Sequence, residues 1–368
     1  AQARQTKNAL RLAFQRYSRS GLLPPLPIMS LAEAIGKDEY DVLRDWPIRE
    51  TPLFVAYGSA EAQAQGLKRM AESFGLVIDL LTLFELHRLR RLDALVARDR
   101  QLLVPFHALS RLRAIKAHKS IFQKDSESLS AIASVLSFVT SQCTAVPVLG
   151  VSDETQGNLQ LRNALDTVSM AALDLARERG LPLLTIDLHL AWVVRQTCAT
   201  MTVDIQSALR DALRRGALPH RDYAACIANL ASNNRRFVSF NANDLLVLAT
   251  DEPQAASEEV LNLLLSTADP SIETAGALNI GCEFLTLAAS AGVAARVVGH
   301  YAFTLRGALV ATKRLISHRS IELSIIERLE AVYGAGGILL SPPDRVALSP
   351  LLVRKVGRRF LRSSIPRK

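Results

Sequence analysis

The sequence predicts an α/β fold in which a parallel sheet is flanked by helices, with helical extensions on its N- and C-terminal sides. Two observations predict this fold class. Short apolar runs at residues 75–79 and 183–187 each end in an aspartate, and helical stretches alternate with them. Apolar runs of this length are typical of the buried strands of parallel sheets, and their alternation with helices indicates β-α-β units.

The first strand-and-acid unit is residues 75–79, which end in Asp79. Residues 80–92 then have the amphipathic pattern of a helix. A second apolar run, residues 102–105, is the next strand, and a basic helix follows it. A further helix is expected at 126–143 and a strand at 146–151. The first four of these stretches form a β-α-β-α series.

The last unit spans residues 164–194. Its helix is indicated by apolar residues at helical spacing, namely Leu165, Val168, Ala172 and Leu175. Gly180 and Pro182 are the expected end of that helix, and residues 183–186 form a strand that delivers Asp187 at its carboxyl end. Catalytic groups and ligands collect at such strand ends in open α/β sheets.

Asp166 stands at the start of the helix in the same unit and is placed to face the same edge as Asp187. Two converging carboxylates suit a divalent metal ion. Arg162 lies one helical turn before Asp166, so a plain ion pair between these two residues is the alternative.

These motifs, in this order, are similar to those of a known nuclease family. They are Val-Ile-Asp-Leu-Leu at 77–81, Leu-Val-Pro at 103–105, Asp166 with its alanine-rich helix, and Leu-Leu-Thr-Ile-Asp at 183–187. The chain resembles the PIN domain family of metal-dependent nucleases, and especially the long PIN domains of bacterial multidomain proteins. The resemblance covers about a third of the chain.

The resemblance implies a PIN-like fold and hydrolysis of phosphodiester bonds with Mg²⁺ or Mn²⁺. It assigns Asp79, Asp166 and Asp187 as the catalytic residues, which act as metal ligands directly or through water. Hard divalent cations prefer carboxylate oxygens, and they orient water while they neutralise charge on the phosphate. The alternative interpretation is that each aspartate caps a helix or closes a turn.

The second acid of the family pattern is missing. The family usually carries it on the helix after the second strand, where this sequence has Ser110 and Arg111. One interpretation is that the Arg111 guanidinium fills the site in place of a metal, which would leave a degenerate nucleic-acid-binding or assembly module. The others are that Glu85, Asp153 or Glu154 completes the site, or that three acids suffice with extra water ligands.

The charge balance favours a polyanionic partner. There are 44 Lys and Arg residues against 35 Asp and Glu, which gives a net charge of +9 and a pI near 9.6. Nucleic acid is therefore the first candidate partner, and the resemblance implies RNA or another single-stranded nucleic acid. The basic helix is expected to hold the phosphate backbone without sequence choice, or alternatively to be a solvated face. Its candidate nucleic-acid-binding residues are Arg111, Arg113, Lys116 and Lys119.

Several function classes are not indicated. The four cysteines form no Cys-x-x-Cys pair, so neither a zinc site nor a disulfide framework is expected. A reducing, cytoplasmic location is expected instead. The sequence has no phosphate-binding Gly-x-x-x-x-Gly-Lys loop, no Gly-x-Ser-x-Gly elbow and no apolar run long enough to predict a membrane span. Trp46 and Trp192 are expected to be core or interface residues rather than base-stacking platforms, and His189 is expected to have a surface or packing role rather than to reach the site.

The chain is expected to have five regions, and other domains or subunits of a larger multidomain protein are expected partners. A helical adaptor with an apolar groove on 251–340 is a further alternative. The regions are a helical N-terminal extension at 1–73, the PIN-like domain at 74–203, an α/β extension packed on it at 204–250, a helical region at 251–340 and a basic tail at 341–368.

Overall fold

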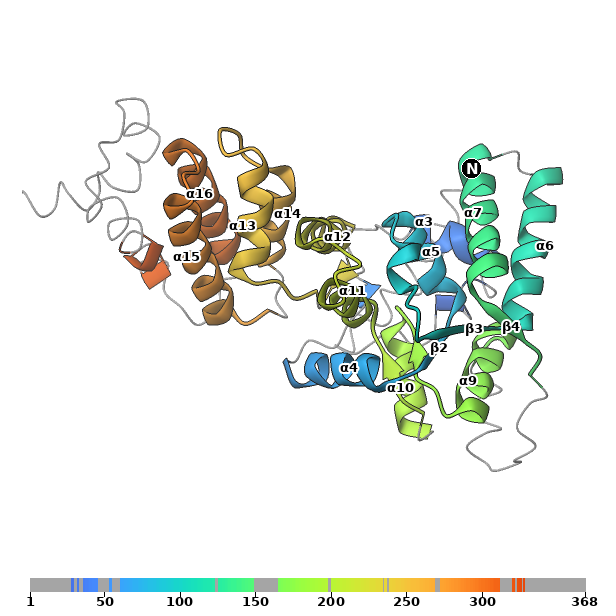
Figure 1. Ribbon diagram of the computed structural model, residues 1–368. Helices are drawn as coiled ribbons and strands as arrows, with labels where there is room; N and C mark the ends of the chain where they lie inside the picture. The colour runs from blue at the N-terminus through green and yellow to red at the C-terminus, as the bar shows by residue number, and fades with distance from the viewer. Residues whose placement is uncertain are drawn as a thin grey trace, which may run out of the picture. The chain divides into compact units, whose positions relative to one another are not determined.

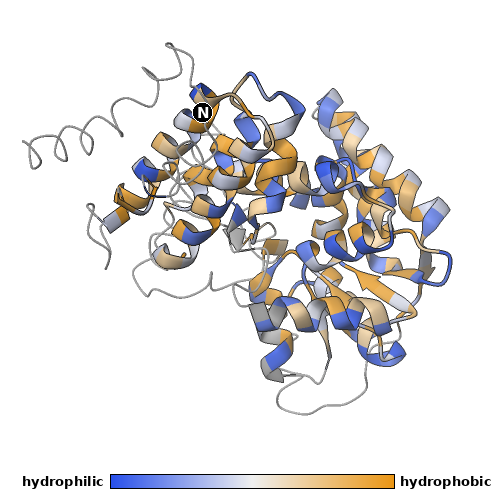
Figure 2. Cartoon of the chain, turned by 60° about the vertical axis from the view of Figure 1, so that its left-hand side comes forward, coloured by the Kyte–Doolittle hydropathy of each residue, from blue (hydrophilic) through white to orange (hydrophobic). Residues whose placement is uncertain are grey.

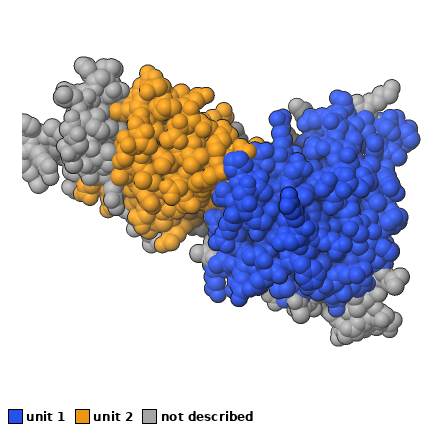
Figure 3. Space-filling model, viewed as in Figure 1, with its two compact units in different colours: residues 1–219, 233–238 blue, residues 220–232, 239–368 orange. Residues whose placement is uncertain are grey.

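The structure is a computed structural model, and its described residues fall into two compact units (Figure 3). The first unit lies within residues 1–219 and 233–238, and the second within 220–232 and 239–368. The described residues are 28–29, 32, 36–45, 53–54, 60–122, 125–148, 165–197, 200–233, 235–236, 238–268, 272–311, 320–321, 323–325 and 327. Arg162, Asp153, Glu154, Trp46 and the predicted basic tail lie outside them.

The first unit is built on a parallel sheet of five strands in the order β4-β3-β2-β5-β6. Helices flank it, and the predicted α/β fold class is confirmed. The strands are β2 (Gly75–Ile78), β3 (Gln101–Pro105), β4 (Thr144–Val146), β5 (Leu183–Leu184) and β6 (Thr202–Val203).

The central strands form because their side chains are apolar on both faces. Leu76, Val77 and Ile78 of β2 are fully buried, and so are Leu183 and Leu184 of β5. Figure 2 shows the strands of the sheet as hydrophobic along their length. A strand of this kind is stable only when helices cover both faces of the sheet.

Helices lie on both sides of this sheet (Figure 1). On one side are α5 (Leu80–Arg88), α6 (Phe106–Phe122) and α7 (Ser126–Gln142), and on the other are α4 (Ala60–Glu72), α9 (Thr167–Arg179) and α10 (Leu188–Thr197). The helix α3 (Glu39–Asp45) contacts α5 and α7, and α11 (Ile205–Arg214) contacts α4. Gly180 ends α9 in the left-handed conformation, with φ 62°, which glycine adopts without strain.

Some bounds differ from the sequence prediction. The strand expected at 146–151 is β4, which ends at Val146, and the helix expected at 80–92 ends at Arg88 before a short 3-10 helix at Leu92–Leu95. The two-residue strand β6 was not predicted. Its residues belong to the sheet through pairing with β5 rather than through any periodicity of their own.

A buried ion pair ties the C-terminal part of this unit to α5. Arg235 lies on β7 (Arg235–Arg236), which pairs in parallel with β1 (Leu53–Phe54). Its guanidinium lies 3.2 Å from the Glu85 carboxylate, and the two side chains are 1% and 0% exposed. Arg88 also pairs with Glu85. Burial alone would raise the pKa of Glu85, but the two guanidinium groups together hold it at about 2.

The described elements of the second unit are helices. They are α12 (His220–Ser232), α13 (Ala242–Asp251), α14 (Glu258–Ser266), α15 (Thr274–Ser290) and α16 (Ala295–Ala311). Gly281 of α15 lies directly against Leu305 of α16, so the helices approach closely there. Residues of the expected extension at 204–250 occur in both units. None of the described helices is both long and apolar enough to cross a membrane.

The Glu85→Gln substitution should destabilise the first unit by about 3 kcal/mol, because it leaves the buried Arg235 guanidinium without a counter-charge. Urea unfolding followed by tryptophan fluorescence would measure this, since both tryptophans lie within residues 1–219. Glu72→Gln is the control, because Glu72 forms an exposed pair with Lys68. Equal midpoints for the two variants would contradict the structural role given to Glu85.

Candidate functional site

The candidate site is the carboxyl edge of β2 and β5, which are neighbours in the sheet. Asp79 directly follows β2, and Asp187 follows β5 by three residues. Two hydroxyl groups hold this edge together: Thr82 Oγ1 accepts a hydrogen bond from Ile186 N at 3.0 Å, and Thr185 Oγ1 accepts one from Asp187 N at 3.0 Å. The positions of both carboxylates are thereby set by strand pairing.

Each predicted aspartate also caps a helix. Asp79 Oδ1 accepts from Thr82 N at 2.6 Å at the start of α5, and Asp166 Oδ1 accepts from two backbone N–H groups at the start of α9. Asp187 Oδ1 accepts from His189 N and Leu190 N at the start of α10. The capping interpretation is therefore observed. It uses one oxygen of each carboxylate and leaves the second oxygen to be explained.

The second oxygens of the two buried aspartates differ. Asp79 Oδ2 is buried and receives no hydrogen bond from the described residues. Asp187 Oδ2 accepts from Ile28 N at 2.6 Å, so a residue of the N-terminal segment reaches the carboxyl edge of the sheet. Ile28 is 1% exposed. At this edge, Asp79 Oδ2 thus has no hydrogen-bond donor among the described residues, whereas Asp187 Oδ2 accepts a hydrogen bond from a backbone N–H.

The carboxylates influence each other's protonation. Burial raises the pKa of Asp79 to about 6, and the negative charge of Asp166 adds to the rise. Burial raises the pKa of Asp187 to about 7, and the negative charge of Asp79 adds to it although backbone N–H groups oppose it. Asp79 therefore interacts electrostatically with both Asp166 and Asp187. Asp79 and Asp187 follow neighbouring strands at one sheet edge, and Asp166 is near enough to raise the pKa of Asp79.

The chemistry of these donors fits Mg²⁺ or Mn²⁺, because both ions prefer carboxylate oxygens and Asp79 Oδ2 is buried without compensation. The ligand set is not already assembled, however. Among the described residues, no three or more His, Cys, Asp and Glu side chains are grouped closely enough to hold one metal ion. Asp187 Oδ2 already accepts one hydrogen bond, from the N–H of Ile28, which takes one of its lone pairs and restricts the directions from which a cation can approach.

Arg111 does not neutralise the aspartates as the degenerate interpretation requires. Its Nε donates to Glu39 Oε1 on α3 at 2.8 Å. A guanidinium beside Asp79 and Asp187 would lower their pKa values, whereas both are raised. Glu85 does not complete the site either, because Arg235 and Arg88 hold its carboxylate.

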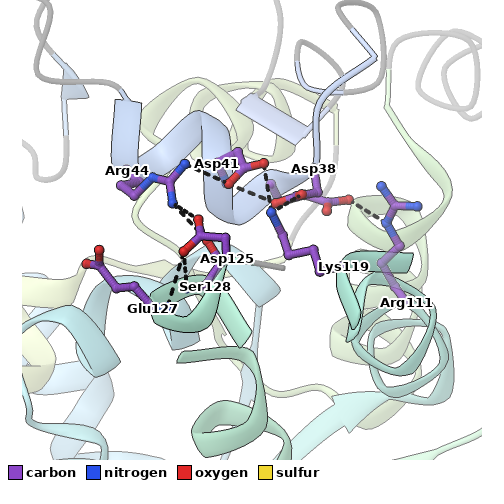
Figure 4. Close-up of polar contacts among 9 residues, drawn as sticks. Asp38, Asp41, Arg44, Arg111, Lys119, Asp125, Glu127 and Ser128 are labelled. Atoms are coloured by element: carbon purple, nitrogen blue, oxygen red, sulfur yellow. Dashed lines mark hydrogen bonds and ion pairs between the residues drawn. The ribbon is translucent and has the colours of Figure 1, made fainter. Parts of the chain in front are cut away.

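The four basic residues predicted to bind nucleic acid divide into two pairs. Arg113 and Lys116 are exposed on α6. Lys119 is 0% exposed, and its Nζ lies 2.8 Å from carboxylate oxygens of both Asp38 and Asp41 (Figure 4). Arg111 and Lys119 are therefore held by acids of the N-terminal segment in this conformation.

Sequence reasoning missed the residues of the N-terminal segment. The signal for Lys119 was readable, because Leu112, Ile115 and Lys119 follow each other at helical spacing and the first two are buried. The acids Asp38, Glu39 and Asp41 could have been matched to that basic helix. The contact of Ile28 has no sequence signal, because every residue except proline carries a backbone N–H.

An aromatic pair lies next to Asp187. His189 is 8% exposed, and its ring lies 6.1 Å from that of Trp192, centroid to centroid. Trp192 is 48% exposed, so it does not lie in the core, and the interface role expected for it stays a prediction.

Comparison with known proteins gives one match. Residues 77–196 match the model of a family described as "PIN domain associated with the TPR-GreAB-C-PIN system". No curated protein matches the chain, and no solved structure does. The matched residues begin within β2 and include Asp79, Asp166, Asp187 and the whole of α6. Residues 77–196 of this chain are a PIN domain.

Proposed function

We propose that the PIN domain is a metal-dependent endonuclease that hydrolyses phosphodiester bonds of RNA or single-stranded nucleic acid with Mg²⁺ or Mn²⁺. The observation that carries the proposal is the burial of Asp79 and Asp187 side by side at the carboxyl edge of the sheet, where each is protonated more readily than an ordinary aspartate. Buried carboxylates with such shifts are typical of functional sites.

Asp79 and Asp187 would hold the cation, and Asp166 would complete its ligands directly or through water. When bound, the cation supplies an activated water and neutralises charge on the phosphate. The helix caps fix one oxygen of each aspartate, so the carboxylates are oriented before any ligand arrives. The pairing of β2 with β5 sets the register of the two strand ends, Thr82 joins α5 to Ile186 across them, and Thr185 fixes the turn that leads into Asp187.

Arg113 and Lys116 would contact the phosphate backbone, since both are exposed on the helix that follows β3. Contacts of this kind supply affinity without sequence choice, and the net charge of +9 favours the same partner. A cytoplasmic location is part of this proposal, because the four cysteines of the sequence form no Cys-x-x-Cys pair.

A second candidate is a catalytically degenerate PIN module that binds nucleic acid or assembles with other domains. One observation favours this degenerate module. Among the described residues, no three acidic or other ligating side chains are grouped closely enough to hold a metal ion. The description of the matched family also names a system with TPR and GreAB-C components. Other domains or subunits of such a system are accordingly proposed partners.

Replacing Asp79 or Asp187 by Asn should reduce Mn²⁺-dependent cleavage of labelled single-stranded RNA by about a hundredfold or more, because a charged metal ligand is lost. Asparagine is as good a helix N-cap as aspartate, so the fold should persist. Gel analysis of the cleavage products would measure the effect.

The matched control is Asp99→Asn, at an exposed residue of the same domain. It should cleave like the parent. Cleavage by the parent that survives in both site variants would refute the metal site. A parent that binds RNA but shows no cleavage would favour the degenerate module.

Mn²⁺ should also raise the melting temperature of the first unit. An ion that binds only the folded state stabilises it by about 2.7 kcal/mol when its concentration is 100 times Kd. Thermal unfolding with and without Mn²⁺, and after EDTA, would measure the shift without relying on catalysis. The shift should vanish in Asp79→Asn and remain in Asp99→Asn. Equal shifts in the two variants would place the bound ion elsewhere.

A further inference from the structure

The N-terminal segment, defined as residues 28, 29, 32 and 36–45, contacts both groups that the proposed function needs. At one end, Ile28 N donates to Asp187 Oδ2 at 2.6 Å. At the other, three carboxylates at the start of α3 bind cations of α6: Asp38 and Asp41 hold Lys119, and Glu39 holds Arg111. The segment thus occupies the acidic site and part of the basic helix together.

The contacts on α6 are those that a phosphodiester backbone would make. Lys119 and Arg111 lie two helical turns apart on one face, and each is met by acidic oxygens at 2.8 Å (Figure 4). A row of negative oxygens along one face of a basic helix is the pattern that phosphates present. The carboxylates of α3 therefore take the place of a polyanion.

A clamp holds α3 in this position. Arg44, in the last turn of α3, lies 2.6 Å from Asp125 and 2.8 Å from Ser128 Oγ at the start of α7. It also pairs with Asp41 at 3.1 Å. The Arg44 side chain is 34% exposed, so this clamp lies at the edge of the contact rather than in the core. Contacts of this kind are weak enough to open and close.

We propose that the face of α6 carrying Arg111 and Lys119 is a phosphodiester-binding surface, and that α3 covers it in the closed state seen here. Nucleic acid and α3 compete for the same two cations. The proposal rests on the nucleic-acid partner of the proposed function, but it concerns binding and does not require cleavage.

The decisive variant is Arg44→Gln, because two explanations of binding predict opposite results for it. Simple charge attraction predicts weaker binding, since the variant loses one positive charge. A competing cover predicts tighter binding, since the loss of one exposed clamp shifts the chain toward the open state. We expect about fivefold tighter binding of labelled single-stranded RNA, measured by fluorescence anisotropy in EDTA.

Lys68→Gln is the matched control. Lys68 is 73% exposed on α4 and pairs only loosely with Glu72, at 3.8 Å. The Lys68→Gln variant also loses one positive charge but leaves the contact between α3 and α6 intact. Its affinity for RNA should therefore equal that of the parent or fall slightly below it. Arg44→Gln binding no tighter than Lys68→Gln would overturn the proposal.

A second measurement does not depend on any variant. Hydrogen exchange of the backbone amides of residues 39–44 in the parent chain should become faster when RNA is added, because α3 leaves α6. Unchanged or slower exchange there would also overturn the proposal. Both measurements are made without metal, so they are independent of the Mn²⁺-dependent cleavage assay. If Arg44→Gln binds RNA more tightly but the parent does not cleave RNA with Mn²⁺, the nuclease proposal fails and the proposal that α3 covers α6 stands. If the parent cleaves RNA but Arg44→Gln binds no more tightly, the nuclease proposal stands and the cover proposal fails.

Discussion

The free-energy cost of burying carboxylates at the carboxyl edge of a parallel sheet is the main physical constraint on the candidate site of this domain. Asp79 and Asp187 are 6% and 2% exposed, and each lies near another negative charge. A buried charge is stable only with a proton, a counter-ion or several hydrogen bonds. The fold supplies helix N-termini, backbone N–H groups and threonine hydroxyls, which orient the acids but do not neutralise them.

Other buried charges in the same unit are treated differently. Glu85 has two guanidinium partners, and Asp211 pairs with Arg100 at 2.8 Å. Arg235 has Glu85 within 3.2 Å in return. The contrast separates two kinds of buried acid. Those with a built-in cation lock elements together, whereas Asp79 and Asp187 at the sheet edge have raised pKa values, so each takes up a proton more readily than an ordinary aspartate.

Much of this arrangement was predictable from the sequence, because the apolar runs of β2, β3 and β5 are buried on both faces and carry a strong local signal. The placement of Asp79 and Asp187 followed from the rule that parallel strands end at a common edge. The short strands β4 and β6 were misplaced or missed, because their pairing partners rather than their own residues define them. The contact of Ile28 with Asp187 joins residues far apart in the chain through a backbone group, and no side-chain pattern encodes it.

The cover and the acidic edge are linked by charge balance. If α3 leaves α6, Lys119 loses both of its counter-ions, and a lysine this deeply buried needs a replacement anion or exposure to water. If Ile28 leaves Asp187, that carboxylate loses a hydrogen bond and needs a cation more strongly than before. Both contacts belong to one short stretch of chain, so its release creates demand for an anion on α6 and for a cation at the sheet edge. Under the two proposals above, a phosphodiester backbone with its divalent counter-ion would meet both demands, and the open state would persist only when such a ligand is present.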